Sequence, residues 1–293
     1  MNELLKRGLT GVIYIFLLLA AIMLNASAFD FLFLIFGIIC IYEFKRIIRL
    51  SEYRIFFTFL LLWWIFIHID INLFIKNILL FAVIITNLIL TFHLFKKEKI
   101  TYTEREKFML SLLYIGGGCI FLPMIYQSEI ARLYVGFEDF RLRQIFSSFP
   151  TEVRSLNEAQ HTMIGILCII WASDSFAYLS GKALGKHKLF PSVSPKKTIE
   201  GFIGGFLGAL LFAVLFSYYS EKSTLTWILL CIMLVVTGAI GDLVESKFKR
   251  VGGKKDSGTI LPGHGGLLDR LDSLIFASPF AYAVLQIIYF INH

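Results

Sequence analysis

Long apolar stretches recur along the whole chain and are separated by short polar segments. A bilayer core about 30 Å thick requires about 20 predominantly apolar residues for each helical crossing. Stretches that reach or approach this length occupy residues 8–28, 29–44, 55–72, 77–95, 107–126, 161–180, 201–220, 224–243 and 271–291. The pattern predicts an all-α integral membrane protein, a polytopic bundle of about nine transmembrane helices.

The apolar stretches leave no room for a separate soluble domain, so they predict a single polytopic membrane domain over residues 1–293. The chain is 57% hydrophobic and 17% charged, whereas a soluble domain has about 25% charged residues. Residues 1–126 are interpreted as an N-terminal helical scaffold. Residues 161–293 are interpreted as the catalytic helices and cytoplasmic loops.

Basic residues are distributed unevenly around these stretches, and the formal net charge is +7. Of the 28 Lys and Arg residues, 22 fall in five polar segments that lie on one side of a nine-helix bundle: 1–7, 45–54, 96–107, 182–197 and 247–270. Such loops are usually cytoplasmic. We therefore expect a cytoplasmic N-terminus, an outside C-terminus and a site that faces the cytoplasm from the cell (inner) membrane.

Two of these segments combine basic residues with acids and glycines. If the eighth helix continues beyond the membrane boundary, one face of it carries Asp242, Ser246, Lys249 and Arg250. Asp269 and Asp272 share a face at the start of the ninth helix, where two neighbouring anions are costly unless a cation neutralises them. Carboxylate oxygens suit Mg²⁺, which typically takes one or two carboxylates together with substrate phosphates.

The segment between these helices is rich in glycine, which allows backbone N–H groups to approach an anion. Lysines and Arg250 add positive charge for phosphate oxygens. The combination indicates a site for phosphoryl or nucleotidyl transfer. The alternative is an ordinary solvated basic loop. Such a loop has no need of the polar residues among its cations, which are Asp256, His264, Asp269 and Asp272.

An earlier polar segment carries a second set of candidates. Asp174 lies within an apolar stretch, where an acid is a functional candidate; the alternative is a helix-end carboxylate that contacts water or a lysine. Lys196, Lys197 and Thr198 precede a helix predicted to begin near Glu200, and a helix N-terminus is a favourable anion site.

Together the motif residues form the pattern Ser246-x-x-Lys249-Arg250-x4-Lys255-Asp256-x-Gly258-x3-Pro262-x-His264-Gly265-Gly266-x-x-Asp269-Arg270-x-Asp272. This pattern resembles the signature of phosphatidate cytidylyltransferases, also called CDP-diacylglycerol synthases. The resemblance covers about the C-terminal 125 residues well, and the first 150 match only as hydrophobic helices. It implies phosphatidate and CTP as substrates, membrane lipids as surroundings and a homodimer; no nucleic-acid partner is expected.

On this interpretation, Asp242 and Asp269 bind Mg²⁺, and Asp256 and Asp272 are further ligands or orienting groups; a second metal cation stays open. The groups expected to hold the triphosphate are Lys249, Arg250, Lys255 and Arg270. Lys196, Lys197 and Thr198 are expected to contact a phosphate rather than a protein carboxylate, and His264 a phosphate or the metal shell. Ser246, Gly265, Gly266 and Asp174 complete the predicted substrate-binding set.

Two other functions stay open. In a CTP-dependent lipid kinase, a lipid alcohol would attack the γ-phosphorus with the same metal and phosphate groups, and CDP would be released. In a membrane transporter, intramembrane acids would bind the cargo. Transporters commonly show internal repeats and paired broken helices, and neither is evident in this sequence.

Overall fold

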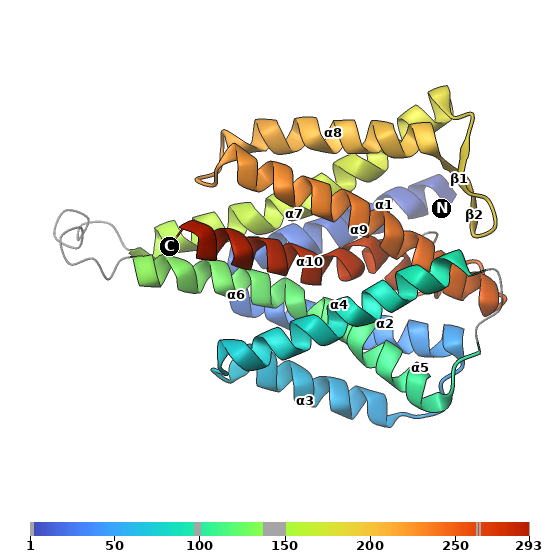
Figure 1. The fold of residues 1–293 in the computed structure, drawn as a ribbon, viewed down its shortest axis with the longest axis horizontal. Coiled ribbons are helices and arrows are strands. Elements are labelled where there is room, and N and C mark those ends of the chain that lie inside the picture. Colours follow the sequence, from blue (N-terminus) through green and yellow to red (C-terminus); the bar gives the residue numbers. More distant parts are fainter. Residues whose placement is uncertain (1–2, 97–100, 137–150, 262, 264, 293) are drawn as a thin grey trace.

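The computed structural model describes residues 3–96, 101–136, 151–261, 263 and 265–292. These residues form an elongated helical bundle with one small β-hairpin (Figure 1). The helices are α1 (Glu3–Leu24), α2 (Ala26–Ile48), α3 (Arg54–His68), α4 (Leu73–Phe95), α5 (Glu104–Leu110), the π-helix η1 (Ser111–Gly117), α6 (Gly118–Gly136), α7 (Thr151–Leu184), α8 (Ile199–Ser217), α9 (Thr224–Val251) and α10 (Leu268–Asn292).

The polytopic all-α prediction is confirmed, because each apolar stretch of the sequence lies mainly within these helices. In the described part of the chain, six helical segments are long and apolar enough to cross a membrane: Leu73–Phe95, Glu104–Glu129, Glu158–Leu184, Ile199–Ser217, Thr224–Val251 and Leu268–Asn292. Thr10–Leu24 and Arg54–His68 are shorter apolar helices. The count of about nine crossings stays a prediction.

The boundary between the first two helices falls earlier than the hydrophobic pattern indicates. It lies at Asn25, whose side chain accepts a hydrogen bond from the backbone N–H of Ala28 at 2.7 Å and so caps α2. Asparagine is a preferred N-cap residue because its oxygen satisfies an amide that has no partner within the helix. Hydrophobicity continues through this break, so periodicity could not locate it.

The polar segments converge at one end of the bundle. Lys107 donates to the carbonyl of Arg49 at 3.4 Å, Lys247 to that of Lys96 at 2.7 Å, and Lys254 to that of Arg46 at 3.0 Å. Figure 1 shows the start of α1, the hairpin and the end of α9 at this end, and the end of α10 at the other. This arrangement agrees with the predicted grouping of the basic segments.

A short antiparallel hairpin, β1 (Lys188–Phe190) and β2 (Ser194–Thr198), joins α7 to α8 and was not predicted. Glu200, in the first turn of α8, accepts hydrogen bonds from the ring of His187 at 2.6 Å and from the backbone N–H of Lys186 at 3.0 Å. Thr198 is the N-cap of α8 and accepts from the N–H of Gly201 at 3.1 Å. These bonds fix the hairpin over the predicted helix start, which is confirmed.

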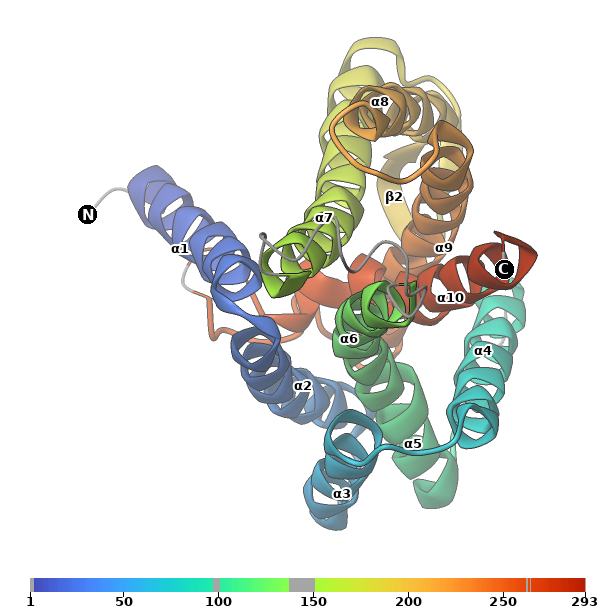
Figure 2. The same cartoon turned by 90° about the vertical axis from the view of Figure 1, so that its left-hand side faces the viewer.

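In the view along the bundle, α7, α8 and α9 group on one side and α3, α4 and α5 on the other, with α10 between them (Figure 2). α10 contacts α9, α6, α4 and η1. The α7–α8 contact is close because glycines of α8 face α7: a Cβ on Gly205 would lie 2.7 Å from the carbonyl oxygen of Ser173. Small residues permit such close approach between membrane helices.

Candidate active site

The candidate site is a cavity of about 590 Å³ between α1, α7, α9 and α10, which we call the acidic cavity. Its charged lining residues are Asp174, Asp242, Lys249, Asp256, Asp269, Arg270 and Asp272. All seven were predicted as site residues, although they come from three separate parts of the sequence. Five carboxylates facing two cations make the cavity suitable for a ligand that brings positive charge, such as a metal ion.

Asp242 lies where the apolar part of α9 ends. α9 continues to Val251, as predicted, and Ser246, one turn after Asp242, donates to its carboxylate at 3.3 Å. The second oxygen of Asp242 forms an ion pair with Lys197 of β2. Lys197 was expected to contact a phosphate rather than a protein carboxylate. In this structure it contacts a carboxylate, because the hairpin folds back over α9.

Asp269, in the first turn of α10, accepts most of the hydrogen bonds in the site. Lys249 contacts its Oδ1 at 2.6 Å. The backbone N–H of Ser257 lies 2.9 Å from Oδ2, the Ser257 hydroxyl 2.9 Å and the Gly266 N–H 2.7 Å. A carboxylate offers about four lone-pair positions, so these donors occupy nearly all of them. Asp269 therefore organises the loop before α10.

Two glycines of this loop, Gly265 and Gly266, lie against the same carboxylate. Gly265 has φ +88°, a conformation that glycine adopts readily. A Cβ at Gly265 would lie 2.7 Å from Oδ2 of Asp269. The sequence predicted that glycine N–H groups approach an anion; for Gly266, the anion in this structure is the protein's own carboxylate.

Asp272 lies one turn after Asp269 and is 7% exposed. Its Oδ1 accepts from the backbone N–H of Ser273 at 2.7 Å. The carboxylate of Asp242 is close enough to repel the carboxylates of both Asp272 and Asp174. Carboxylates gathered in this way are stabilised when a cation binds between them.

Oxygen ligands of this kind fit Mg²⁺. Among the described residues, no three His, Cys, Asp or Glu side chains are already arranged to hold an ion. Mg²⁺ does not require such a set, since it commonly binds one or two carboxylates, waters and substrate phosphates. Asp242 and Asp272 fit this role better than Asp269, whose oxygens are already hydrogen-bonded.

A second cavity of about 370 Å³, the lysine cavity, adjoins the first between α7, β2, α8 and α9. Its basic lining residues are Lys182, Lys196 and Lys197, and its apolar ones include Ile170, Leu189, Phe202, Leu234 and Val235. Asp174 and Ser273 line both cavities. A ligand with an apolar body and an anionic head fits this lining.

Some predicted residues lie elsewhere. Arg250 and Lys255 are not among the described residues that line either cavity, and Arg250 instead donates to the carbonyl of Val193 at 3.5 Å. Thr198 lines the lysine cavity, but its hydroxyl caps α8. His264 lies outside the described residues.

Two buried acids were missed by the sequence reasoning. Glu245 is 0% exposed and forms an ion pair with Lys249, so this lysine bridges Glu245 and Asp269. Glu43 of α2 contacts the loop before α10. The available signal was an acid inside an apolar helix. Glu43 lies next to Lys45 and Arg46, which were used only as part of a basic segment that indicates orientation, so its carboxylate was not considered as a site residue.

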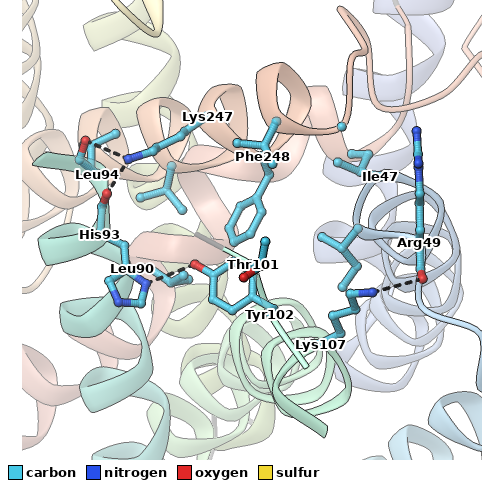
Figure 3. A pocket seen from close by; sticks show the side chains of 14 residues that line it. Ile47, Arg49, Leu90, His93, Leu94, Thr101, Tyr102, Lys107, Lys247 and Phe248 are labelled. Carbon is cyan, nitrogen blue, oxygen red and sulfur yellow. Dashed lines mark hydrogen bonds between the residues drawn. The ribbon is translucent and has the colours of Figure 1, made fainter. Parts of the chain in front are cut away.

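A third cavity, of about 290 Å³, lies beside α9, where Lys247 points toward the end of α4 and the ring of Phe248 points toward Tyr102 (Figure 3). Lys247 donates to the carbonyls of His93 and Leu94 at the end of α4. His93 and Tyr102 are hydrogen-bonded at 3.0 Å. The described residues that line this cavity include no carboxylate, so it does not resemble the acidic cavity chemically.

Fold and site together define a multi-pass α-helical membrane protein with an acidic and a lysine-lined cavity at one end. The model of the cytidylyltransferase family matches residues 5–288, and the chain belongs to this family. The resemblance inferred from the signature is therefore confirmed.

Curated proteins similar to this chain include several named phosphatidate cytidylyltransferase. The phosphatidate cytidylyltransferase of Bacillus subtilis (strain 168) is 34% identical over 298 residues, covering 98% of this chain and 99% of that protein. The protein of the same name from Staphylococcus aureus (strain COL) is 37% identical over 194 residues, covering 66% of this chain. That alignment spans 63% of the S. aureus protein, less than two thirds of its length.

Proposed function

We propose that this protein is a CTP:phosphatidate cytidylyltransferase, which makes CDP-diacylglycerol and pyrophosphate for phospholipid biosynthesis. The observation that carries the proposal is the junction of the acidic and lysine cavities at Asp174. One cavity suits a metal-bound nucleotide triphosphate, and the other suits a lipid with an anionic head. The names of the B. subtilis and S. aureus relatives support the same substrates.

In the proposed reaction, an ionised phosphate oxygen of phosphatidate attacks the α-phosphorus of CTP. A P–O bond forms to the lipid phosphate while the bond from the α-phosphorus to the bridging oxygen breaks. That oxygen leaves with pyrophosphate, and no proton has to be removed from the nucleophile. Both reactants are anions, so the residues act mainly by binding, alignment and charge neutralisation.

Asp242 and Asp272 would hold Mg²⁺, with Asp256 as a further ligand or orienting group. Bound Mg²⁺ supplies charge neutralisation at the phosphate oxygens. Lys249 and Arg270 line the acidic cavity and would contact the nucleotide phosphates. Lys196 and Lys182 line the lysine cavity and would contact the lipid phosphate.

Lys197 stands between these two groups. It lines the lysine cavity and pairs with Asp242 of the acidic cavity. With a Mg²⁺ ion held by Asp242, the Lys197 ammonium group would be attracted less strongly to that carboxylate, because two cations would share one anion. Lys197 would then be free to contact a phosphate at the junction of the two cavities, so the observed ion pair and the predicted phosphate contact are compatible.

We further propose that the protein lies in the cell membrane with both cavities facing the cytoplasm, where CTP is present, and that it forms a homodimer. The basic residues at the cavity end support this orientation.

The deciding experiment supplies purified protein with CTP, phosphatidate and Mg²⁺ and identifies the products by mass. CDP-diacylglycerol and pyrophosphate are expected. Release of CDP with a newly phosphorylated lipid would instead identify a lipid kinase. A vesicle counterflow assay without CTP tests the transporter alternative.

A further inference from the structure

Glu43 joins the N-terminal scaffold to the loop of the candidate site. It lies on α2, is 1% exposed, and accepts hydrogen bonds from the backbone N–H groups of Leu267 at 3.2 Å and Leu268 at 2.8 Å. These amides stand at the start of α10, where helix geometry leaves N–H groups without partners. An anion at this position is also stabilised by the helix dipole.

The Ser257 hydroxyl connects Glu43 to Asp269. Its Oγ lies 3.1 Å from Oε2 of Glu43 and 2.9 Å from Oδ2 of Asp269. A hydroxyl has one proton to donate, so it donates to one carboxylate at a time, while the Ser257 backbone N–H stays directed at Asp269. Displacing Glu43 therefore affects the residue that positions Asp269.

Two glycines of the loop, Gly258 and Gly266, pack so closely against Glu43 that a side chain at either position would collide with it. A Cβ on Gly258 would lie 2.2 Å from Oε1 of Glu43, and its other near contacts are also Glu43 atoms. A Cβ on Gly266 would lie 2.5 Å from Oε2 of Glu43 and 2.0 Å from Oγ of Ser257. Glycine at these positions lets the chain pass directly over the buried carboxylate.

We propose that Glu43 is a positioning residue for the transfer reaction: it fixes the loop before α10 so that Asp269 and Asp272 face the acidic cavity. The inference rests on the proposed function for its kinetic test, but the contact itself does not. A buried acid that only stabilised the fold would change the amount of folded protein and leave turnover per folded molecule unchanged.

The first test compares Glu43→Ala and Glu43→Gln with Asp30→Asn. Asp30 is also a buried acid on α2, but its carboxylate accepts from Gln127. At saturating CTP, phosphatidate and Mg²⁺, Glu43→Ala should lower turnover about tenfold to hundredfold, the range for losing charge-assisted bonds. Glu43→Gln keeps one acceptor oxygen and should lose less. Asp30→Asn should stay within about twofold of the parent protein per folded molecule.

The second test is a double-mutant cycle with Gly258→Ala. In the parent protein the added methyl group meets Glu43, so turnover should fall. In the Glu43→Ala background the opposing carboxylate is gone, so the same change should cost several-fold less. Coupling of this sign is expected when two residues meet directly. Equal losses in both backgrounds would contradict the contact.

Hydrogen exchange by mass spectrometry provides a readout that does not depend on activity. Amides of residues 257–261 and 265–268 should exchange faster in Glu43→Ala than in Asp30→Asn. Faster exchange with unchanged turnover would overturn the positioning role and leave a structural contact. If the parent protein released CDP instead of pyrophosphate, the proposed function would fail, and the Glu43 variants would be scored on that reaction.

Discussion

Lys247 and Lys249 are two residues apart on α9 and have opposite surroundings. Lys249 lies in the acidic cavity between Glu245 and Asp269. Lys247 donates to backbone carbonyls at the end of α4 and lines the third cavity (Figure 3). Residues two apart on a helix point in different directions, so equal charges at these positions perform different tasks.

Neutralising each lysine should separate these tasks. Lys249→Gln should lower kcat/KM about tenfold to hundredfold, since a charge-assisted bond contributes about 1.5–3 kcal/mol. Lys247→Gln should lower the melting temperature and leave turnover per folded molecule within a few-fold of the parent. Initial rates and thermal unfolding in the same detergent measure both. A larger loss of kcat/KM in Lys247→Gln than in Lys249→Gln would contradict the assignment of the reaction to the acidic cavity.

The acids of the cavity should also differ in their response to Mg²⁺. Asp242→Asn and Asp269→Asn should each reduce turnover about a hundredfold or more at ordinary Mg²⁺. Excess Mg²⁺ should partly restore Asp242→Asn, because a weakened metal site fills by mass action. It should not restore Asp269→Asn, whose loss disturbs the loop.

Glu52→Gln is the matched control for these acid variants, because Glu52 pairs with Arg54 in the exposed segment before α3; it should change little. The Mg²⁺ titration for each variant is the measurement. Restoration of Asp269→Asn alone would reverse the two assignments.

At the scale of elements, sequence reasoning succeeded where the signal is local. Helical spacing placed Asp242 and Ser246 together, and the start of α8 was predicted within one residue. The hairpin was missed because its strands have three and five residues, and one of them contains Pro195. Glu43 was missed because its partners lie more than 200 residues away, a separation that periodicity does not report.

The close contact of α7 and α8 predicts a difference between two glycine substitutions. Gly205→Ala should lower the melting temperature, because its Cβ would lie 2.7 Å from a backbone oxygen and the helices would have to separate. Gly238→Ala on α9 should be neutral or slightly stabilising. The added Cβ would lie 3.5 Å from its nearest neighbour, the Cβ of Ser273, and alanine is more favourable than glycine in a helix by about 1 kcal/mol. Thermal unfolding decides, and equal melting temperatures would contradict the packing.

At the scale of the whole molecule, the two cavities lie at the end of the bundle where the basic segments converge. Hydrogen bonds between residues far apart in sequence connect these segments, such as Lys247 to Lys96 and Lys254 to Arg46. The hydrophobic pattern alone predicted the grouping of basic residues. It could not predict that α10 would lie between the scaffold helices and the α7–α9 group (Figure 2), since this depends on packing between distant segments.

The ends of the chain provide the last prediction. The start of α1 lies at the cavity end, and the end of α10 lies at the opposite end (Figure 1). A reporter fused before Met1 should therefore be cytoplasmic and one fused after His293 should be outside, because the basic segments favour the cytoplasmic side. Paired fusions that are active on one side only, such as alkaline phosphatase and a fluorescent protein, measure both positions in intact cells. A cytoplasmic reporter after His293 would contradict the orientation, and an outside reporter before Met1 would place the cavities away from CTP.

The basic residues of segment 247–270 cannot be neutralised to test the orientation alone, because Lys249 and Arg270 line the acidic cavity. Lys96 and Lys97 belong to another basic segment. Neutralising both tests whether basic charge outside the site contributes to the orientation, and the same paired reporters measure it.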